Sequence, residues 1–87
     1  MPKAERKKQM LHLLADSELA LPPRVIYENL VMAGATYSYK TVHRHLQESL
    51  EDGLVEHPDR KDSYYQITKK GRSFLAKDLD EDEVMES

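Results

Sequence analysis

The chain has 87 residues, of which 39% are hydrophobic and 33% are charged, and it contains no cysteine and no tryptophan. A chain of this length can form one small core, which excludes a second domain and a large catalytic cleft. The lack of cysteine excludes disulfides, thiolate metal sites and a cysteine nucleophile, so we expect a reducing, cytoplasmic location. The chain begins with charged residues and has no long apolar run, so we expect neither a secretory signal nor a membrane span.

The charge is unevenly distributed along the chain. The formal net charge is −3, but residues 78–87 contain six acidic residues and no basic one. Residues 1–77 contain 13 basic against 10 acidic residues, a net charge of +3. The overall acidity therefore does not argue against a nucleic-acid partner for the body of the protein. We expect one domain over residues 1–79 and a disordered acidic tail over residues 80–87.

Two helices are expected in the first part of the chain. Residues 3–16 combine good helix formers with apolar residues at helical spacing. A short extended piece, 19–21, precedes a proline pair, and proline is well placed in the first turn of a helix. We therefore expect a second helix over 23–33, which Gly34 ends in a left-handed conformation. Its expected core residues are Val25, Ile26, Leu30 and Ala33.

The most regular apolar stripe lies in a third expected helix, over residues 39–51. Ser38 precedes this segment and is a favourable N-cap residue. Gly53 lets the chain leave the helix and turn at once into a strand. The stripe has spacings of three, four and four residues and consists of Tyr39, Val42, Leu46 and Leu50.

The remainder predicts a β-hairpin and a last helix. Strand formers at 54–57 and 63–68 flank a polar turn, 58–62, and we expect one of the two tyrosines at 64 and 65 to point inward. Thr68 is expected to cap a helix over 69–79, in which Gly71 permits close packing against the hairpin. The expected inward residues of this helix are Phe74, Leu75 and Leu79.

This order of elements predicts an α+β, mostly helical fold, the winged helix-turn-helix, with a three-helix core, a β-hairpin wing and a C-terminal helix. Three segments are similar to small archaeal winged helix-turn-helix transcriptional regulators, including those described as phage-repressor-like. These segments are YSYKTVHRHL at 37–46, LEDGLV at 50–55 and YQITKKGRSFL at 65–75. The resemblance covers about residues 10–79 and implies an archaeal or mobile-element source.

In such a fold the third helix enters the major groove of DNA. With Val42 and Leu46 inward, its outward residues can contact base edges. Residues of the turn, of the wing and of the second helix's start can contact phosphates. The candidate DNA-binding residues are Lys40, Thr41, Arg44 and Gln47 on the helix, Tyr37 and Ser38 in the turn, Arg60 and Lys61 in the wing, and Arg24.

A solvated surface explains part of this pattern equally well. The polar residues of the third helix suit any exposed helix face, and Asp59 and Asp62 weaken the positive charge of the wing. His43 and His45 are two residues apart on a helix, so they point in different directions and cannot readily bind one metal ion. We expect His43 at the boundary or toward DNA, and His45 on the surface or in a dimer contact.

No motif indicates catalysis. The sequence has no glycine-rich phosphate loop, nucleophile motif or metal-binding pattern, so we expect no enzyme, no cofactor, no metal and no small-molecule ligand. We predict a sequence-specific, double-stranded DNA-binding transcriptional regulator that represses by occluding a promoter. The alternative is a winged-helix protein-interaction module, an adaptor or antirepressor, which the modest body charge supports. RNA binding is a weaker alternative because the motifs of RNA-binding modules are absent.

Two further expectations concern partners. A small module makes few base contacts, so we expect a homodimer on a two-fold site. The first and last helices are free for pairing, with Met10, Leu13 and Leu79 as candidate contacts. The basic residues at the start either follow DNA phosphates or pair with the acidic tail, and the tail can screen the DNA-binding face. These basic residues are Lys3, Arg6, Lys7 and Lys8.

Overall fold

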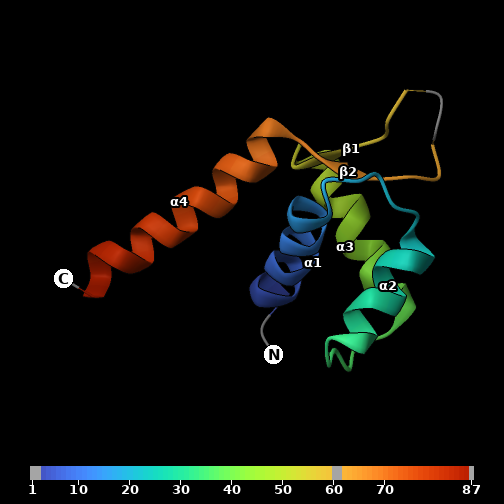
Figure 1. Cartoon of the computed structure of the whole chain (residues 1–87), viewed down its shortest axis with the longest axis horizontal. Helices are drawn as coiled ribbons and strands as arrows, with labels where there is room; N and C mark the ends of the chain where they lie inside the picture. Colours follow the sequence, from blue (N-terminus) through green and yellow to red (C-terminus); the bar gives the residue numbers. More distant parts are fainter. Residues whose placement is uncertain (1–2, 60–61, 87) are drawn as a thin grey trace.

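The computed structural model describes residues 3–59 and 62–86, with side chains described for residues 5–59 and 62–77 (Figure 1). Within these residues the fold is α+β and mostly helical, with four helices and one two-stranded antiparallel hairpin. The elements are α1 (Lys3–Ser17), α2 (Pro23–Met32), α3 (Tyr39–Glu51), β1 (Val55–Glu56), β2 (Gln66–Ile67) and α4 (Lys69–Glu86). The expected positions of the first three helices are confirmed to within one residue.

The core lies where α1, α2 and α3 pack together and where the hairpin closes over one end. Each helix contributes apolar side chains at helical spacing, and burying one such side chain stabilises the fold by about 1.5–3 kcal/mol. The buried apolar residues are Met10, Leu11, Leu14, Ile26, Leu30, Tyr37, Val42, Leu46, Leu54, Val55, Tyr65 and Leu75.

The hairpin is shorter than expected, but it gains a third segment. β1 and β2 pair in the register Val55↔Ile67, and immediately before β2 the backbone of Tyr65 pairs with that of Leu21. Each of these two residues donates its N–H to the other's carbonyl at 2.9 Å. The extended piece before α2 is thus joined to the hairpin. Tyr65 is buried and Tyr64 is exposed, so the expected inward and outward tyrosines are confirmed.

The end of α3 and the start of α4 meet at one junction. Gly53 adopts φ of +77° and turns the chain out of α3. The Thr68 hydroxyl donates to the Gly53 carbonyl at 2.7 Å and accepts from the Gly71 N–H at 2.9 Å, so it caps α4 as expected. The Thr68 N–H donates to the Leu54 carbonyl at 3.0 Å. These bonds attach α4 to the base of the hairpin.

Some residues expected in the core are exposed. Tyr39 and Phe74 are 37% and 39% exposed, Ala33 is exposed, and Val25 is only half-buried. Ala33 is not in the core because α2 ends at Met32, which leaves Ala33 outside the helical stripe. Phe74 is not in the core because α4 rests on the body through Gly71 and Leu75. The neighbouring face of α4, which carries Phe74, therefore turns outward.

α4 extends beyond its expected end. The predicted end at Leu79 is wrong, because the helix continues through the acidic segment to Glu86, where we expected a disordered tail. Adding residues to an existing helix needs no new nucleation, which favours this continuation. Figure 1 shows α4 projecting away from the other three helices. Among the described residues, no helix combines the length and the apolar character needed to cross a membrane.

The junction predicts that Gly71→Ala destabilises the protein. In an open helix this change stabilises by up to about 1 kcal/mol. Here the added methyl group would overlap the Leu54 carbonyl oxygen and lie 2.6 Å from Ile67 Cγ1. Overpacking of this kind costs about 1–3 kcal/mol, so we expect a net loss in urea unfolding. Ser73→Ala, at an exposed position of α4, is the control and should not destabilise; equal stability of the two variants would contradict the close approach.

Candidate nucleic-acid interface

The start of α3 is fixed by its N-cap and by an aromatic contact with α2. The Ser38 hydroxyl accepts a hydrogen bond from the Thr41 N–H at 3.2 Å, so the predicted N-cap is confirmed. The Tyr27 and Tyr39 rings meet edge to face, with 5.8 Å between their centroids. An edge-to-face contact of aromatic rings is favourable and restricts how the two helices cross.

α3 presents one continuous polar face to solvent. Lys40, Arg44 and Gln47 are exposed and share this face at spacings of four and three, while Val42 and Leu46 are buried on the opposite side, as predicted. Thr41 is half-buried, with its hydroxyl 3.2 Å from that of Ser38. The face is basic in its first half, and Glu51 makes its far end acidic.

Arg24, at the start of α2, packs on the first residue of α3. Its guanidinium carbon lies 5.9 Å from the centre of the Tyr39 ring, and its Nε is paired with the Glu28 carboxylate at 3.3 Å. The centroid of the Tyr39 ring also lies 6.2 Å from the centroid of the His43 ring. We expected Tyr39 in the core; it instead joins Arg24 to α3, because it occupies the first position of the helix, at the edge of the apolar stripe.

Gln47 connects α3 to the hairpin. Its Nε2 donates to the Tyr65 hydroxyl at 2.6 Å. Burial raises the pKa of Tyr65, an effect that the hydrogen bond from Gln47 partly offsets, so the hydroxyl stays protonated at neutral pH. The His57 ring packs on the Tyr65 ring with 4.7 Å between centroids. Arg60 and Lys61, the candidates at the hairpin tip, lie outside the described residues.

Tyr37 is not available for a phosphate contact, contrary to the expectation. Its ring is buried, and its hydroxyl donates to Gln9 Oε1 of α1 at 3.0 Å. Burial raises the pKa of Tyr37, although the positive charge of Arg6 opposes the rise. The sequence placed Tyr37 in an exposed turn, but the turn passes over α1, which covers the ring.

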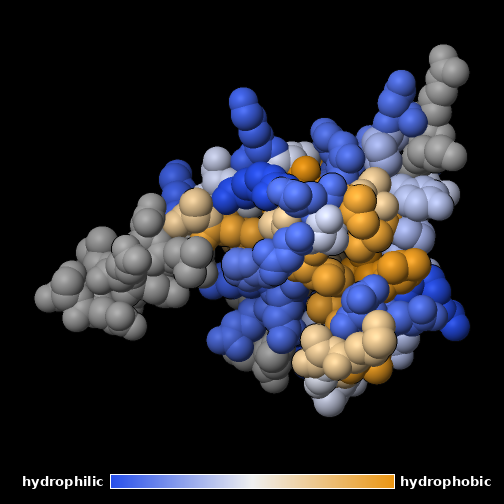
Figure 2. Space-filling view, viewed as in Figure 1, coloured by the Kyte–Doolittle hydropathy of each residue, from blue (hydrophilic) through white to orange (hydrophobic). Residues whose placement is uncertain are grey.

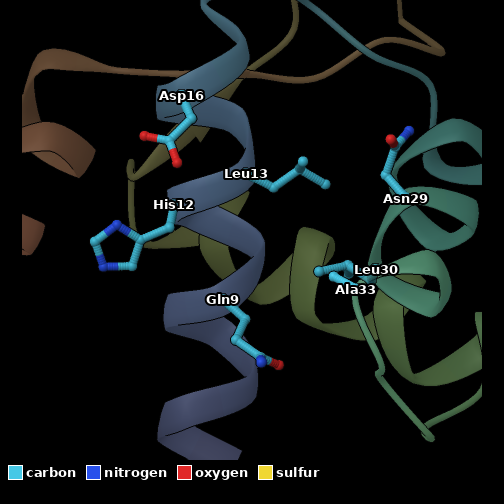
Figure 3. Close-up of a pocket in the computed structure, with 7 residues that line it drawn as sticks. All are labelled: Gln9, His12, Leu13, Asp16, Asn29, Leu30 and Ala33. Carbon is cyan, nitrogen blue, oxygen red and sulfur yellow. The ribbon is translucent and has the colours of Figure 1, made fainter.

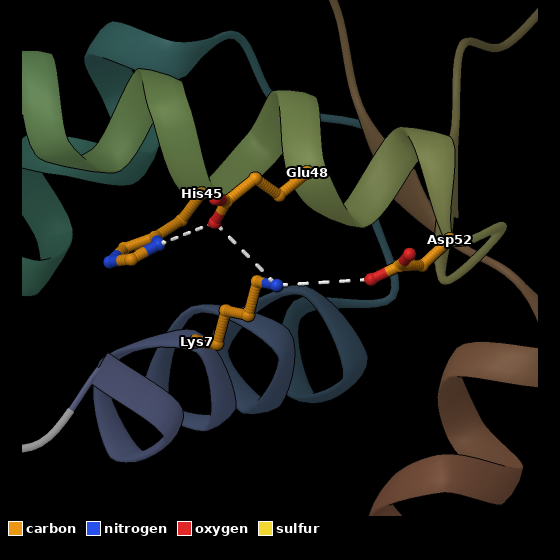
Figure 4. A network of polar contacts seen from close by, with 4 residues as sticks. All are labelled: Lys7, His45, Glu48 and Asp52. Carbon is orange, nitrogen blue, oxygen red and sulfur yellow. Dashed lines mark hydrogen bonds and ion pairs between the residues drawn. The ribbon is translucent and has the colours of Figure 1, made fainter.

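Two basic residues of α1 are also used inside the fold. The Arg6 guanidinium carbon lies 5.2 Å from the centre of the Tyr37 ring. Lys7 Nζ lies 3.6 Å from Glu48 Oε1 and 3.8 Å from Asp52 Oδ2 of α3 (Figure 4). Both residues therefore hold α1 against its neighbours. We expected them to follow DNA phosphates or to pair with the acidic tail, and the contacts described here are of neither kind.

His45 is the largest departure from the sequence expectation. We expected it on the surface or in a dimer contact, but it is only 1% exposed and faces α1. Its Nδ1 lies 3.4 Å from Glu48 Oε1 (Figure 4). Its Nε2 is buried and has no hydrogen-bond partner among the described residues. The prediction that His43 and His45 point in different directions is confirmed, because His43 is exposed.

Burial lowers the pKa of His45. The Glu48 carboxylate opposes this effect, while Arg44 and Lys7 add to it. A second ring proton would place an N–H at Nε2, where no acceptor is in reach. The neutral ring, donating from Nδ1 to Glu48, is therefore the form that the α1–α3 interface accommodates.

A shallow groove of about 270 Å³ lies between α1 and α2. Figure 2 shows hydrophobic surface in this region, and in Figure 3 Leu13 points across the gap toward Leu30 and Ala33. Polar side chains, among them Gln9 and Asn29, complete the lining. Of the expected dimer contacts, Met10 is buried in the core and is not accessible. Leu13 lines this groove. The side chain of Leu79 is not among those that the structure describes.

Comparisons with known proteins identify no relative of this chain. No family model matches the chain, and neither a curated protein nor a solved structure is significantly similar to it. Within the described residues there is no group of three or more histidine or acidic side chains able to hold a metal ion.

His45 predicts a pH-dependent stability. Because the pKa of His45 is lower in the folded state, the unfolded chain binds this proton first as the pH falls below about 6.5. While only the unfolded state is protonated, each pH unit removes about 1.4 kcal/mol from the free energy of unfolding. We expect urea unfolding between pH 7 and pH 5 to show this loss, and His45→Gln to flatten the dependence. Ser73→Ala, at an exposed position without a titratable group, is the control and should keep the wild-type slope; parallel curves for all three proteins would contradict the assignment.

Proposed function

We propose that this protein is a winged helix-turn-helix DNA-binding transcriptional regulator, of the kind found among small archaeal, phage-repressor-like regulators. The order α2, short turn, α3, hairpin and α4 supports this proposal. The observation that carries it is the exposed first half of α3, where Lys40 and Arg44 lie on one face and Arg24 packs on Tyr39 at the start of the helix. A helix that presents basic residues near its N-terminus suits the major groove and its phosphates.

In this proposal the residues of α3 divide into two groups. Arg44 and Gln47 contact base edges, since arginine pairs with guanine and glutamine with adenine through two hydrogen bonds. Lys40, Ser38 and Arg24 contact phosphates and fix the position of the helix on the duplex. Thr41 is half-buried, so it contributes only through the edge of its side chain. The hairpin is the wing, with Arg60 and Lys61 on the flanking DNA.

The proposed mechanism is repression by occupying a promoter. The described residues form three packed helices, the hairpin and α4, and a body of this kind seated on DNA blocks access to the sequence beneath it. A two-fold DNA site read by two copies would double the number of base contacts.

A protein-interaction module is the second candidate. The charge balance favours it, because residues 1–77 carry only +3 and Glu51 interrupts the basic face of α3.

The salt dependence of DNA binding distinguishes the two functions. DNA binding through phosphates weakens by about 0.9 log units per contact for each tenfold rise in salt. We would titrate a labelled random duplex and the DNA upstream of the protein's own coding sequence at 50 and 200 mM salt. Salt-dependent binding that favours the upstream DNA supports the regulator, and no binding at 50 mM supports the interaction module.

Arg44→Ala tests whether α3 is the element that contacts the bases. Loss of a two-bond contact to guanine costs about 1–3 kcal/mol of binding and relaxes the preference at one base pair. The measurement is fluorescence anisotropy on the selected DNA and on its single-base variants. Glu51→Ala, on the same face but acidic, is the matched control and should bind at least as tightly as the wild type. An unchanged base preference in Arg44→Ala would exclude α3 from base recognition.

A further inference from the structure

α4 is divided into two halves of opposite charge. Residues 69–77 contain four basic residues and no acidic one, whereas residues 78–86 contain six acidic residues and no basic one. Each half is nine residues long, and both belong to one helix, Lys69–Glu86. Neighbouring like charges destabilise an isolated helix, so the acidic half gains most from an external partner of opposite charge.

The basic half carries a groove on one face. The groove is a hollow of about 200 Å³. It is lined by Leu54 and by four residues of α4 that are spaced three, one and three residues apart: Lys70, Ser73, Phe74 and Lys77. All four residues of α4 are exposed, and the Phe74 ring is 39% exposed. The groove therefore offers an apolar floor with two ammonium groups on its rim.

The acidic half of the same helix cannot fill this groove. A continuous helix holds its two halves end to end, about 27 Å in total length for 18 residues. The neighbouring face of α4 is already used, because Gly71 and Leu75 rest on the body of the protein. Figure 1 shows the helix leading away from α1, α2 and α3. The acidic half of α4 can therefore reach this groove only from a second copy of the chain.

We propose that this groove binds the acidic half of α4 from a second copy of the chain, so that two α4 helices pair antiparallel about a two-fold axis. Because the two halves have equal length, antiparallel alignment at the midpoint places each acidic half on the basic half of the other helix. The contact is the same on both copies, as a two-fold interface requires. It does not depend on DNA binding, and it would place two copies of α3 in one particle.

Length and charge both suit this pairing. Packed helices lie about 8–10 Å apart, which is comparable to the screening distance of about 10 Å at 0.1 M salt. Opposite charges on facing helices therefore attract at low ionic strength, and at 1 M salt, where the screening distance is about 3 Å, the attraction is largely lost. The Phe74 ring adds an apolar contact near the middle of the pair.

The first test is the mass of the full chain in solution. Sedimentation equilibrium at 50 mM salt should give a dimer at tens of micromolar, with a dissociation constant that rises at least tenfold at 1 M salt. A monomer at 200 micromolar and 50 mM salt would overturn the proposal. A dimer whose dissociation constant is unaffected by salt would also overturn it.

Charge exchange then tests the pairing itself. Lys77→Glu and Glu81→Lys each place like charges on both sides of the interface, so each alone should weaken self-association at least tenfold. Mixing the two variants brings opposite charges together again and should yield the mixed dimer in native mass spectrometry. Arg72→Glu makes the same change of charge at an exposed position outside the groove and should leave the dimer intact.

These outcomes separate the proposed interface from any other. Circular dichroism of each variant confirms that α4 and the rest of the fold are retained. If Lys77→Glu and Arg72→Glu weaken the dimer equally, or if the mixed variants fail to associate, the antiparallel α4 interface is wrong.

Discussion

The close contact between Gly71 and the backbone of Leu54 determines where the other parts of the structure lie. Thr68 holds the two sides of this contact together, because its side chain and its N–H bond to the carbonyls of Gly53 and Leu54. α3 ends immediately before this point, β1 begins immediately after it, and α4 begins immediately beyond Thr68. The direction of α3, the base of the hairpin and the course of α4 are consequently set together at one site where no side chain larger than hydrogen fits.

The two proposed surfaces belong to the two helices that meet at this junction. The DNA-binding face belongs to the first half of α3, and the groove for a second copy belongs to the first half of α4. The junction, the hairpin and α1, which packs against both α3 and α4, connect the two surfaces. This separation lets a two-fold pair form without using the residues that we assign to DNA.

Local chemistry could be predicted from the sequence, whereas contacts between distant segments could not. Ser38, Gly53 and Gly71 were predicted correctly because a cap, a left-handed turn and a missing side chain act on their immediate neighbours. Tyr37 and His45 were placed wrongly because each is covered by α1, whose position over α3 depends on the packing of the whole core. At the candidate site, Lys40, Arg44 and Gln47 were correctly placed outward by helical spacing. The contact between Arg24 and Tyr39 joins two helices and leaves no signal in the spacing of either one.

The hydrogen bond from Gln47 to Tyr65 has a consequence for recognition. A glutamine amide has two N–H donors and one carbonyl acceptor. With one donor held by Tyr65, the other donor and the carbonyl remain, which are the two groups that a glutamine presents to adenine. A free glutamine side chain loses rotational freedom when it binds, a cost of about 0.5–1.5 kcal/mol for a flexible side chain. Here Tyr65 has already ordered the side chain during folding. In the DNA complex that we propose, the hairpin would thus sharpen base discrimination at the centre of α3 without touching DNA there.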